Sequence, residues 1–276
     1  MLFLQIIIPA HSLAYYRAGV KSRLFLFDTF EESNYYTYMK YTGLGKKYIN
    51  IEGSFGGSQE WFKDIGMKWK GRAIEGYGCG LVGAADLLLH ILGNDIIPND
   101  RSEKNSLITK DIYISFLRRL EKRYFHIFPK LGLSGILLAL GINLYLFFHR
   151  KEIRENTGYK YHARWAVRPS KLLERIKEML GNDIPVIIAI GPGFFRKEKV
   201  RFYNKRKDDK GRTVFKPVTK TKDHYVTVTG VEEGEHTFLE ISSWGKKYYI
   251  NFDEYLEYVK KNDNFYFSNI LYVSRK

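Results

Sequence analysis

The sequence predicts an α+β fold, in which a helical half precedes a half built from antiparallel strands. Up to residue 182, apolar residues recur at helical spacing in several segments. After that point, short apolar segments rich in β-branched residues alternate with polar residues. Because the two patterns are segregated along the chain, we expect helices and an antiparallel sheet in separate layers.

Four segments carry the helical pattern. The first begins at Gly78-Cys79-Gly80 and ends at Gly93-Asn94, where glycine and asparagine typically terminate a helix. A proline and a serine at 169–170 mark the start of the last one, which ends at Gly181-Asn182. The predicted helices therefore cover about 78–92, 106–125, 133–149 and 169–181.

The second half of the chain contains the expected strands. Apolar or alternating residues predict strands at 184–190, 224–230, 237–243, 246–251 and 265–273. A turn near Glu233-Gly234-Glu235 would join two of them as a hairpin. The basic stretch 196–222 is interpreted as a hairpin or loop.

Length and composition indicate a globular protein with one large domain. The chain has 276 residues, of which 45% are apolar and 16% aromatic, enough for a sizeable core. We expect residues 1–54 to form an N-terminal extension packed on the core and residues 55–276 to form the domain. The apolar start at 2–9 has no preceding Lys or Arg and makes a poor signal peptide, so the sequence gives the location as cytoplasmic or unknown and leaves export open.

The formal net charge is +15, which raises the question of an anionic partner. The basic residues are spread along the chain, and the densest stretch is interrupted by Glu198, Asp208 and Asp209. We therefore interpret them as a solvated surface and expect no nucleic-acid partner. With one cysteine and seven scattered histidines, the sequence predicts no intramolecular disulfide, no metal site and no cofactor.

The segment from Leu131 to Phe148 has no charged residue over 18 positions. A membrane span needs about 20 apolar residues, so the segment lies near that threshold. Its glycines and Asn143 favour a helix buried in the domain. A span would also put Cys79 and His224 on opposite sides of the membrane, so the site described next excludes it.

Cys79 opens the first predicted helix between two glycines. A thiol in the first helical turn lies at the positive end of the helix dipole, which lowers its pKa, and flanking glycines allow a substrate backbone to approach. A small buried side chain after a turn is the simpler interpretation of Cys79 taken alone.

His224 opens an alternating strand, His224-Tyr225-Val226-Thr227-Val228, and the partner strand ends in Ser242-Ser243-Trp244-Gly245. A base that activates a thiol needs a rigid element and a group that orients its ring. A hairpin would bring Ser242 level with His224, and Ser243 or Asp223 could substitute for it.

A cysteine that opens a helix, then a histidine that opens a strand, then a Ser-Trp-Gly turn, resembles the papain-like cysteine peptidases. The bacterial branch of peptidase domains that process bacteriocin leaders is most similar, and the resemblance covers about residues 55–262. It implies a papain-like fold, Cys79 as nucleophile and His224 as general base. The family usually has Asn or Asp where this chain has Ser242.

The family also uses a glutamine six residues before the cysteine to stabilise the oxyanion. This chain has Ala73 there, and the nearest upstream glutamine is Gln59. Three functions follow from the resemblance: a peptidase or amidase acting on a peptide or small amide, an acyl- or peptidyl-transferase on the same fold, and a peptide-binding member without activity.

Overall fold

The computed structural model describes residues 40–63, 69–93, 108–128, 132–191, 198–262 and 265–276. The chain divides into two units, 1–36 and Thr37–Lys276, and only the second contains described residues. The first unit lies outside the described residues, and so does the apolar start that was assessed as a signal peptide.

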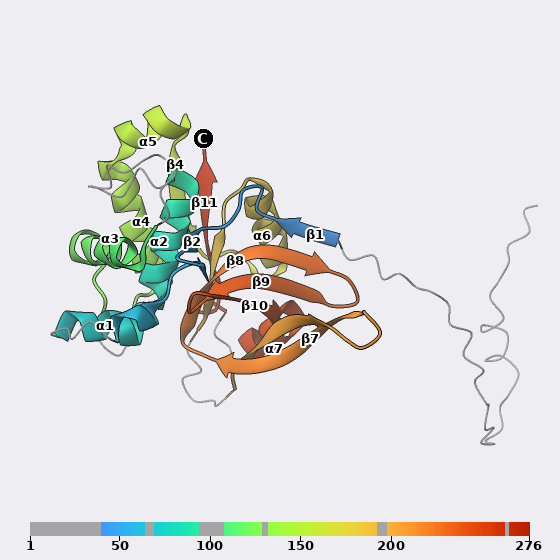
Figure 1. The fold of residues 1–276 in the computed structure, drawn as a ribbon. Coiled ribbons are helices and arrows are strands. Elements are labelled where there is room, and N and C mark those ends of the chain that lie inside the picture. The colour runs from blue at the N-terminus through green and yellow to red at the C-terminus, as the bar shows by residue number, and fades with distance from the viewer. Residues whose placement is uncertain (1–39, 64–68, 94–107, 129–131, 192–197, 263–264) are drawn as a thin grey trace, which may run out of the picture. The chain divides into compact units, whose positions relative to one another are not determined.

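Among the described residues, the second unit is built on a nine-stranded antiparallel sheet (Figure 1). Eight strands follow the order β4-β11-β5-β8-β9-β10-β6-β7, and β1 pairs with β8. The strands are β1 (Lys40–Gly43), β4 (Tyr161–Trp165), β5 (Val186–Ile190), β6 (Val200–Lys207), β7 (Thr213–Thr221), β8 (His224–Glu233), β9 (Thr237–Ser243), β10 (Lys246–Asn251) and β11 (Ile270–Arg275). A small separate hairpin joins β2 (Asn50–Ile51) and β3 (Ser54–Phe55).

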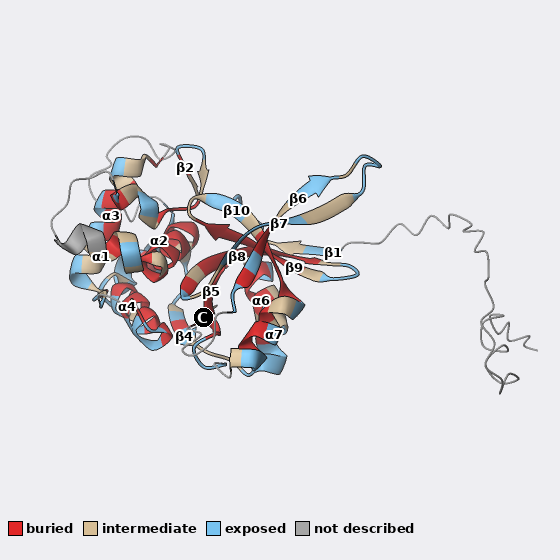
Figure 2. Cartoon of the chain, turned by 90° about the horizontal axis from the view of Figure 1, so that it is seen from below, coloured by how far each residue is buried: buried red, intermediate tan, exposed pale blue. Residues whose placement is uncertain are grey.

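Helices cover the sheet. They are α1 (Trp69–Tyr77), α2 (Cys79–Leu92), α3 (Lys110–Arg123), α4 (Gly135–Phe148), α5 (Arg150–Thr157), α6 (Leu172–Gly181) and α7 (Phe252–Asn262), with short 3-10 helices η2 (Gln59–Phe62) and η4 (Pro169–Lys171). Helix α2 packs against β5 and β8, and α4 packs against β4 and β11. Helices α6 and α7 contact other parts of the same sheet. Figure 2 shows that α2 and the central strands form the buried core.

The predicted α+β class is confirmed as a mixture of helices and antiparallel sheet. Strands β9 and β10 have the predicted bounds, and the basic stretch forms the β6–β7 hairpin. The halves are less segregated than predicted, because α7 lies between β10 and β11. The side chain of Asn251 accepts hydrogen bonds from the backbone N–H groups of Asp253 and Glu254, which starts this helix directly after a strand.

Residues 40–54 are part of the same compact unit as the rest of the sheet. Strand β1 pairs with the C-terminal end of β8, and Tyr48 and Ile51 are buried. Of the expected extension 1–54, residues 40–54 thus contribute to the sheet and the core, and the others lie outside the described residues.

The long uncharged segment contributes helix α4, which has 14 residues. No helix in the described part of the chain is long and apolar enough to cross a membrane.

Candidate active site around Cys79 and His224

Cys79 is the first residue of α2 because the chain turns at Gly78. The Gly78 N–H donates to the Ile74 carbonyl at 2.8 Å, and a Cβ at position 78 would collide with that same carbonyl. Glycine is therefore required where α1 ends and α2 begins. The main-chain N–H groups of Tyr225, Gly80 and Cys79 itself favour the ionised form of the Cys79 thiol and so lower its pKa.

His224 is buried at the start of β8 and is held by two neighbours. Its Nε2 atom lies 2.8 Å from the Oγ atom of Ser243. Its ring stacks on the indole of Trp244, with ring centroids 4.6 Å apart and an angle of 16° between the planes. Both contacts come from the end of β9, so the ring has a fixed orientation.

The β9–β10 turn explains the position of Trp244. Trp244 and Gly245 have φ values of 52° and 72°, as in the two-residue hairpin turns that suit the twist of antiparallel strands. Positive φ is unfavourable for a large side chain such as tryptophan. The turn is fixed to the glycine-rich loop, since Gly245 N–H donates to the Gly57 carbonyl and Phe55 N–H donates to the Gly245 carbonyl, both at 2.9 Å.

Cys79 and His224 line the same cavity, which has a volume of about 20 Å³. That volume is close to what one water molecule needs and far below that of a peptide. The residues around it come from the glycine-rich loop, α2, β8 and the end of β9: Gly57, Gln59, Cys79, Val82, Gly83, Asp86, His224, Tyr225, Val226, Thr227, Ser242, Ser243 and Trp244.

Ser242 does not occupy the position beside the histidine that the sequence predicted. Its hydroxyl donates to the Phe55 carbonyl at 2.7 Å, and it pairs with Thr227 across the strands. The cause is an irregularity in β8 between Val228 and Gly230 that shifts the register. A one-residue shift exchanges the two faces of a strand, so Ser243 replaces Ser242 on the face of His224.

The two other candidate site residues, Gln59 and Asp223, lie in different surroundings. Gln59 lines the cavity, and its Nε2 atom donates to the Glu75 carbonyl at 2.9 Å. The Oε1 atom of Gln59 is buried without a hydrogen-bond partner among the described residues. Asp223, the other possible orienting group, is exposed and has a φ of 55°.

A buried polar network that the sequence analysis missed forms part of the cavity wall. Its centre is Asp86, which accepts hydrogen bonds from the hydroxyls of Tyr48 and Tyr113 and from the N–H of Gly57. The signal in the sequence was a single acid in the apolar stretch from Leu81 to Leu92. Asp86 follows Cys79 by two helical turns, so both lie on the same face of α2.

This network fixes the loop that carries Gln59. Glycine is needed at Gly56, where φ is 77° and a Cβ would collide with Ser242 and Asp86. A Cβ at Gly57 would collide with the Tyr113 hydroxyl. The loop is thus packed tightly between α2, α3 and β9.

Burial determines the protonation of the site. It lowers the pKa of His224 to about 4, and it raises the pKa of the Cys79 thiol above its ordinary value, more strongly than the nearby N–H groups lower it. It also raises the pKa of Asp86 to about 6, against the hydrogen bonds from Tyr113, Gly57 and Tyr48. At neutral pH the site therefore holds a neutral thiol, a neutral imidazole and an ionised Asp86.

No group of three or more His, Cys, Asp or Glu side chains in the described part of the chain is arranged to hold a metal ion. Comparisons with protein-family models, curated proteins and solved structures found no match for this chain.

Proposed function

We propose that this chain is a papain-like cysteine peptidase or amidase that cleaves a peptide or amide bond with Cys79 as nucleophile and His224 as base. One observation supports this most. The thiol at the start of α2 and the imidazole at the start of β8 line one cavity, although they are far apart in the sequence. The imidazole is also oriented by Ser243 and Trp244, as a general base requires.

In the proposed reaction, the neutral pair reacts without prior ionisation. The Cys79 Sγ atom attacks the substrate carbonyl carbon while its proton passes to His224. Because Nε2 is bonded to Ser243, Nδ1 is the ring nitrogen assigned to the proton. The imidazolium then protonates the leaving amine, the C–N bond breaks, and a thioester remains. Water, activated by the neutral imidazole, hydrolyses the thioester and restores the thiol.

Two groups are assigned to the developing oxyanion. The first is the backbone N–H of Cys79 at the start of α2, where the helix dipole also favours negative charge. The second is Gln59, whose Nε2 uses one hydrogen for the Glu75 carbonyl and has a second one for the cavity. A substrate has to open the cavity, since its volume of about 20 Å³ admits little more than a water molecule.

A peptide-binding member without activity is the second candidate. The small cavity and the neutral thiol and imidazole favour it. An acyl- or peptidyl-transferase would use the same thioester and differ only in the acceptor.

The test is incubation of the full chain with a complex peptide mixture, followed by mass spectrometry of new termini. We expect new termini with the wild type and none with Cys79→Ala. Replacing His224 with glutamine should reduce the rate by about a hundredfold or more. An added amine that appears on the new carboxyl termini would indicate a transferase. Equal cleavage by the wild type and Cys79→Ala, or no cleavage by either, would contradict the proposal.

A further inference from the structure

Helix α4 has an apolar face that the domain does not cover. Its sequence is apolar on every side except for Asn143 and Tyr145, and Leu138, Ile142 and Tyr145 are buried in the domain. On the opposite side, large apolar side chains are 51–66% exposed: Ile136, Leu140, Phe147 and Phe148. A helix that is apolar all round is usually buried in a core or in contact with lipid.

Four of the exposed residues form one stripe, and Phe148 lies beside it at the end of the helix. Ile136, Leu140, Leu144 and Phe147 follow each other at intervals of four, four and three residues, so they project from the same side of the helix. The polar side chain of Asn143 is used inside the domain. It exchanges two hydrogen bonds with the backbone of Ala163 in β4 and thereby fixes the rotation of α4.

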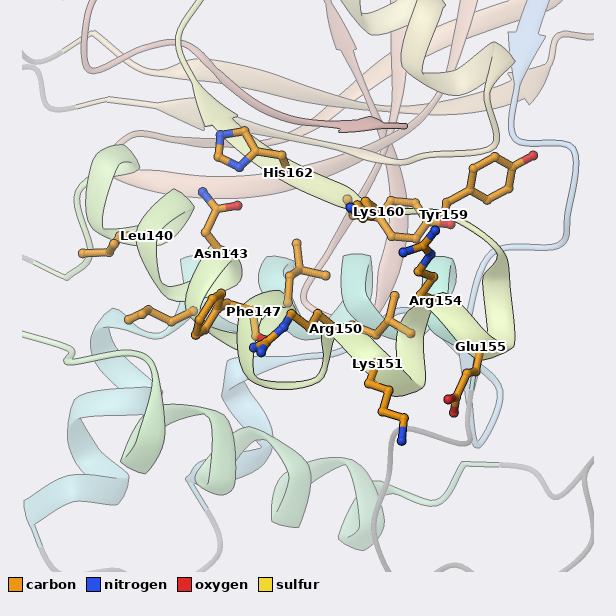
Figure 3. Close-up of a pocket in the computed structure, with 14 residues that line it drawn as sticks. Leu140, Asn143, Phe147, Arg150, Lys151, Arg154, Glu155, Tyr159, Lys160 and His162 are labelled. Carbon is orange, nitrogen blue, oxygen red and sulfur yellow. The ribbon is translucent and has the colours of Figure 1, made fainter.

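A groove beside this stripe has a basic rim. It has a volume of about 960 Å³ and lies between α4, α5 and β4 (Figure 3). Leu140, Leu144 and Phe147 form part of its apolar wall. Its charged residues are four cations and one acid: Arg150, Lys151, Arg154, Lys160 and Glu155.

The cations of the rim are available for an anionic partner. None of Arg150, Lys151, Arg154 and Lys160 forms an ion pair with another described residue. Arg150 is placed at the junction of the two surfaces, since its guanidinium lies 4.6 Å from the centre of the Phe147 ring and donates to the Phe147 carbonyl. An apolar stripe next to a row of cations is the pattern of helices that lie in a membrane interface.

We propose that this face of α4, with the basic rim from α5 and β4, docks on an anionic phospholipid surface. The exposed apolar side chains would enter the headgroup and acyl boundary, and the cations would contact phosphates. A helix of 14 residues is about 21 Å long, which is too short to cross a hydrocarbon core of about 30 Å but suits a helix lying flat.

Charge argues for lipid over a second copy of the chain. In a symmetric dimer through this face, each basic rim would lie against the corresponding surface of the partner, and the like charges would repel. An anionic bilayer has an apolar interior and, next to it, negatively charged headgroups. The interior suits the exposed apolar stripe of α4, and the headgroups suit the basic rim.

The test is co-sedimentation of the full chain with phosphatidylcholine vesicles, prepared with and without phosphatidylserine. We expect at least about tenfold tighter binding to the anionic vesicles, weakening as salt increases. Replacing Leu140 and Phe148 together with serine should reduce binding about tenfold or more, and so should reversing Lys151 and Arg154 to glutamate.

Matched controls lie on β7. Reversing Lys216 and Lys220 to glutamate changes the net charge by the same amount on exposed positions of another element, and Val218→Ser removes an exposed apolar group there. These variants and Cys79→Ala should bind like the wild type, and circular dichroism should show all variants folded. Absence of binding to anionic vesicles would overturn the proposal. Equal losses of vesicle binding in the β7 variants would also overturn it. So would a dimer of the wild type that the double variant at Leu140 and Phe148 no longer forms.

Discussion

The Oγ atom of Ser243 lies 2.8 Å from the Nε2 atom of His224, so the proposed reaction assigns the Cys79 proton to the other ring nitrogen, Nδ1. The neighbouring hydroxyl, that of Ser242, donates to the Phe55 carbonyl instead. Two adjacent serines at the end of one strand thus have separate tasks. One orients the imidazole, and the other fastens the glycine-rich loop.

Replacing each serine with alanine separates these tasks. Ser243→Ala should lower peptide cleavage about tenfold, because the imidazole loses the partner that fixes its tautomer. Ser242→Ala should leave cleavage nearly unchanged and reduce the free energy of unfolding by about 1 kcal/mol, the usual contribution of one hydrogen bond. Cleavage rates and urea unfolding of both variants give the comparison. A larger loss of cleavage in Ser242→Ala would reverse the assignment.

The pKa values predict how the resting thiol reacts. Burial raises the pKa of Cys79 and lowers that of His224 to about 4, so a thiolate–imidazolium pair does not form at neutral pH without substrate. Alkylation of Cys79 by iodoacetamide should therefore increase only at or above pH ~8.5, where a free thiol ionises. His224→Gln should leave this profile unchanged. A wild-type midpoint well below that of a free thiol would show that the pair ionises at rest.

The two buried titrating groups should give stability slopes of opposite sign. His224 has a folded pKa below its unfolded value of 6.5, so its contribution is complete above pH 6.5 and is lost as pH falls towards 4. Asp86 has a folded pKa of about 6, above its unfolded value of 3.8, so its contribution is complete below pH 3.8 and is lost as pH rises towards 6. Each shift corresponds to about 3 kcal/mol.

Denaturant unfolding between pH 4 and 7 tests this opposition. Relative to the wild type, Asp86→Asn should lose more stability as pH falls, because only the His224 slope remains. His224→Gln should gain stability as pH falls, because only the Asp86 slope remains. Parallel curves for the wild type and both variants would show that neither pKa is shifted by folding.

The sequence predicted which residues come together better than how they are arranged. Cys79 and His224, taken from motif order, and Gln59, taken as the nearest upstream glutamine, line one cavity. A helix start and a strand start are marked by local residues. Ser243 was given only as an alternative. A regular hairpin would put Ser242 on the face of His224, and the irregularity between Val228 and Gly230 reverses this. The local signal is Gly230, because a glycine inside a strand is typical of such an irregularity, but the sequence analysis took it as the end of the strand.

The buried network shows a second limit of sequence analysis. Tyr48, Asp86 and Tyr113 come from three separate segments and meet only in the folded chain. Asp86 could have been noticed as an acid in an apolar helix, but its partners could not. Similarly, α4 was expected to be buried, whereas only one side of it packs against the domain.

The glycine-rich loop provides a prediction with a control in the same chain. Gly57→Ala should destabilise the protein by several kcal/mol, since the new Cβ would meet the Tyr113 hydroxyl in a fully buried network. Gly76→Ala, at an exposed position of α1 with no atom near the new Cβ, should be neutral or stabilise by up to about 1 kcal/mol. Thermal unfolding of the two variants measures the difference, and similar melting temperatures would show that the loop can move away from Tyr113.

Trp244 should control the protonation of His224. Its indole covers the imidazole, and its φ of 52° is unfavourable for tryptophan but tolerated by asparagine. Trp244→Asn therefore keeps the turn and removes the cover, and water should then reach the ring. The pKa of His224 should rise from about 4 towards 6.5, as the desolvation that lowers it is relieved.

Titration of the His224 ring by NMR measures this shift, and Trp244→Phe is the control. A phenyl ring still covers the imidazole, so the pKa should stay near that of the wild type. In Trp244→Asn the imidazole would be a stronger base, and cleavage at low pH would fall because more of it is protonated. An unchanged pKa in Trp244→Asn would mean that β8 and the Ser243 side, and not the indole, exclude water from His224.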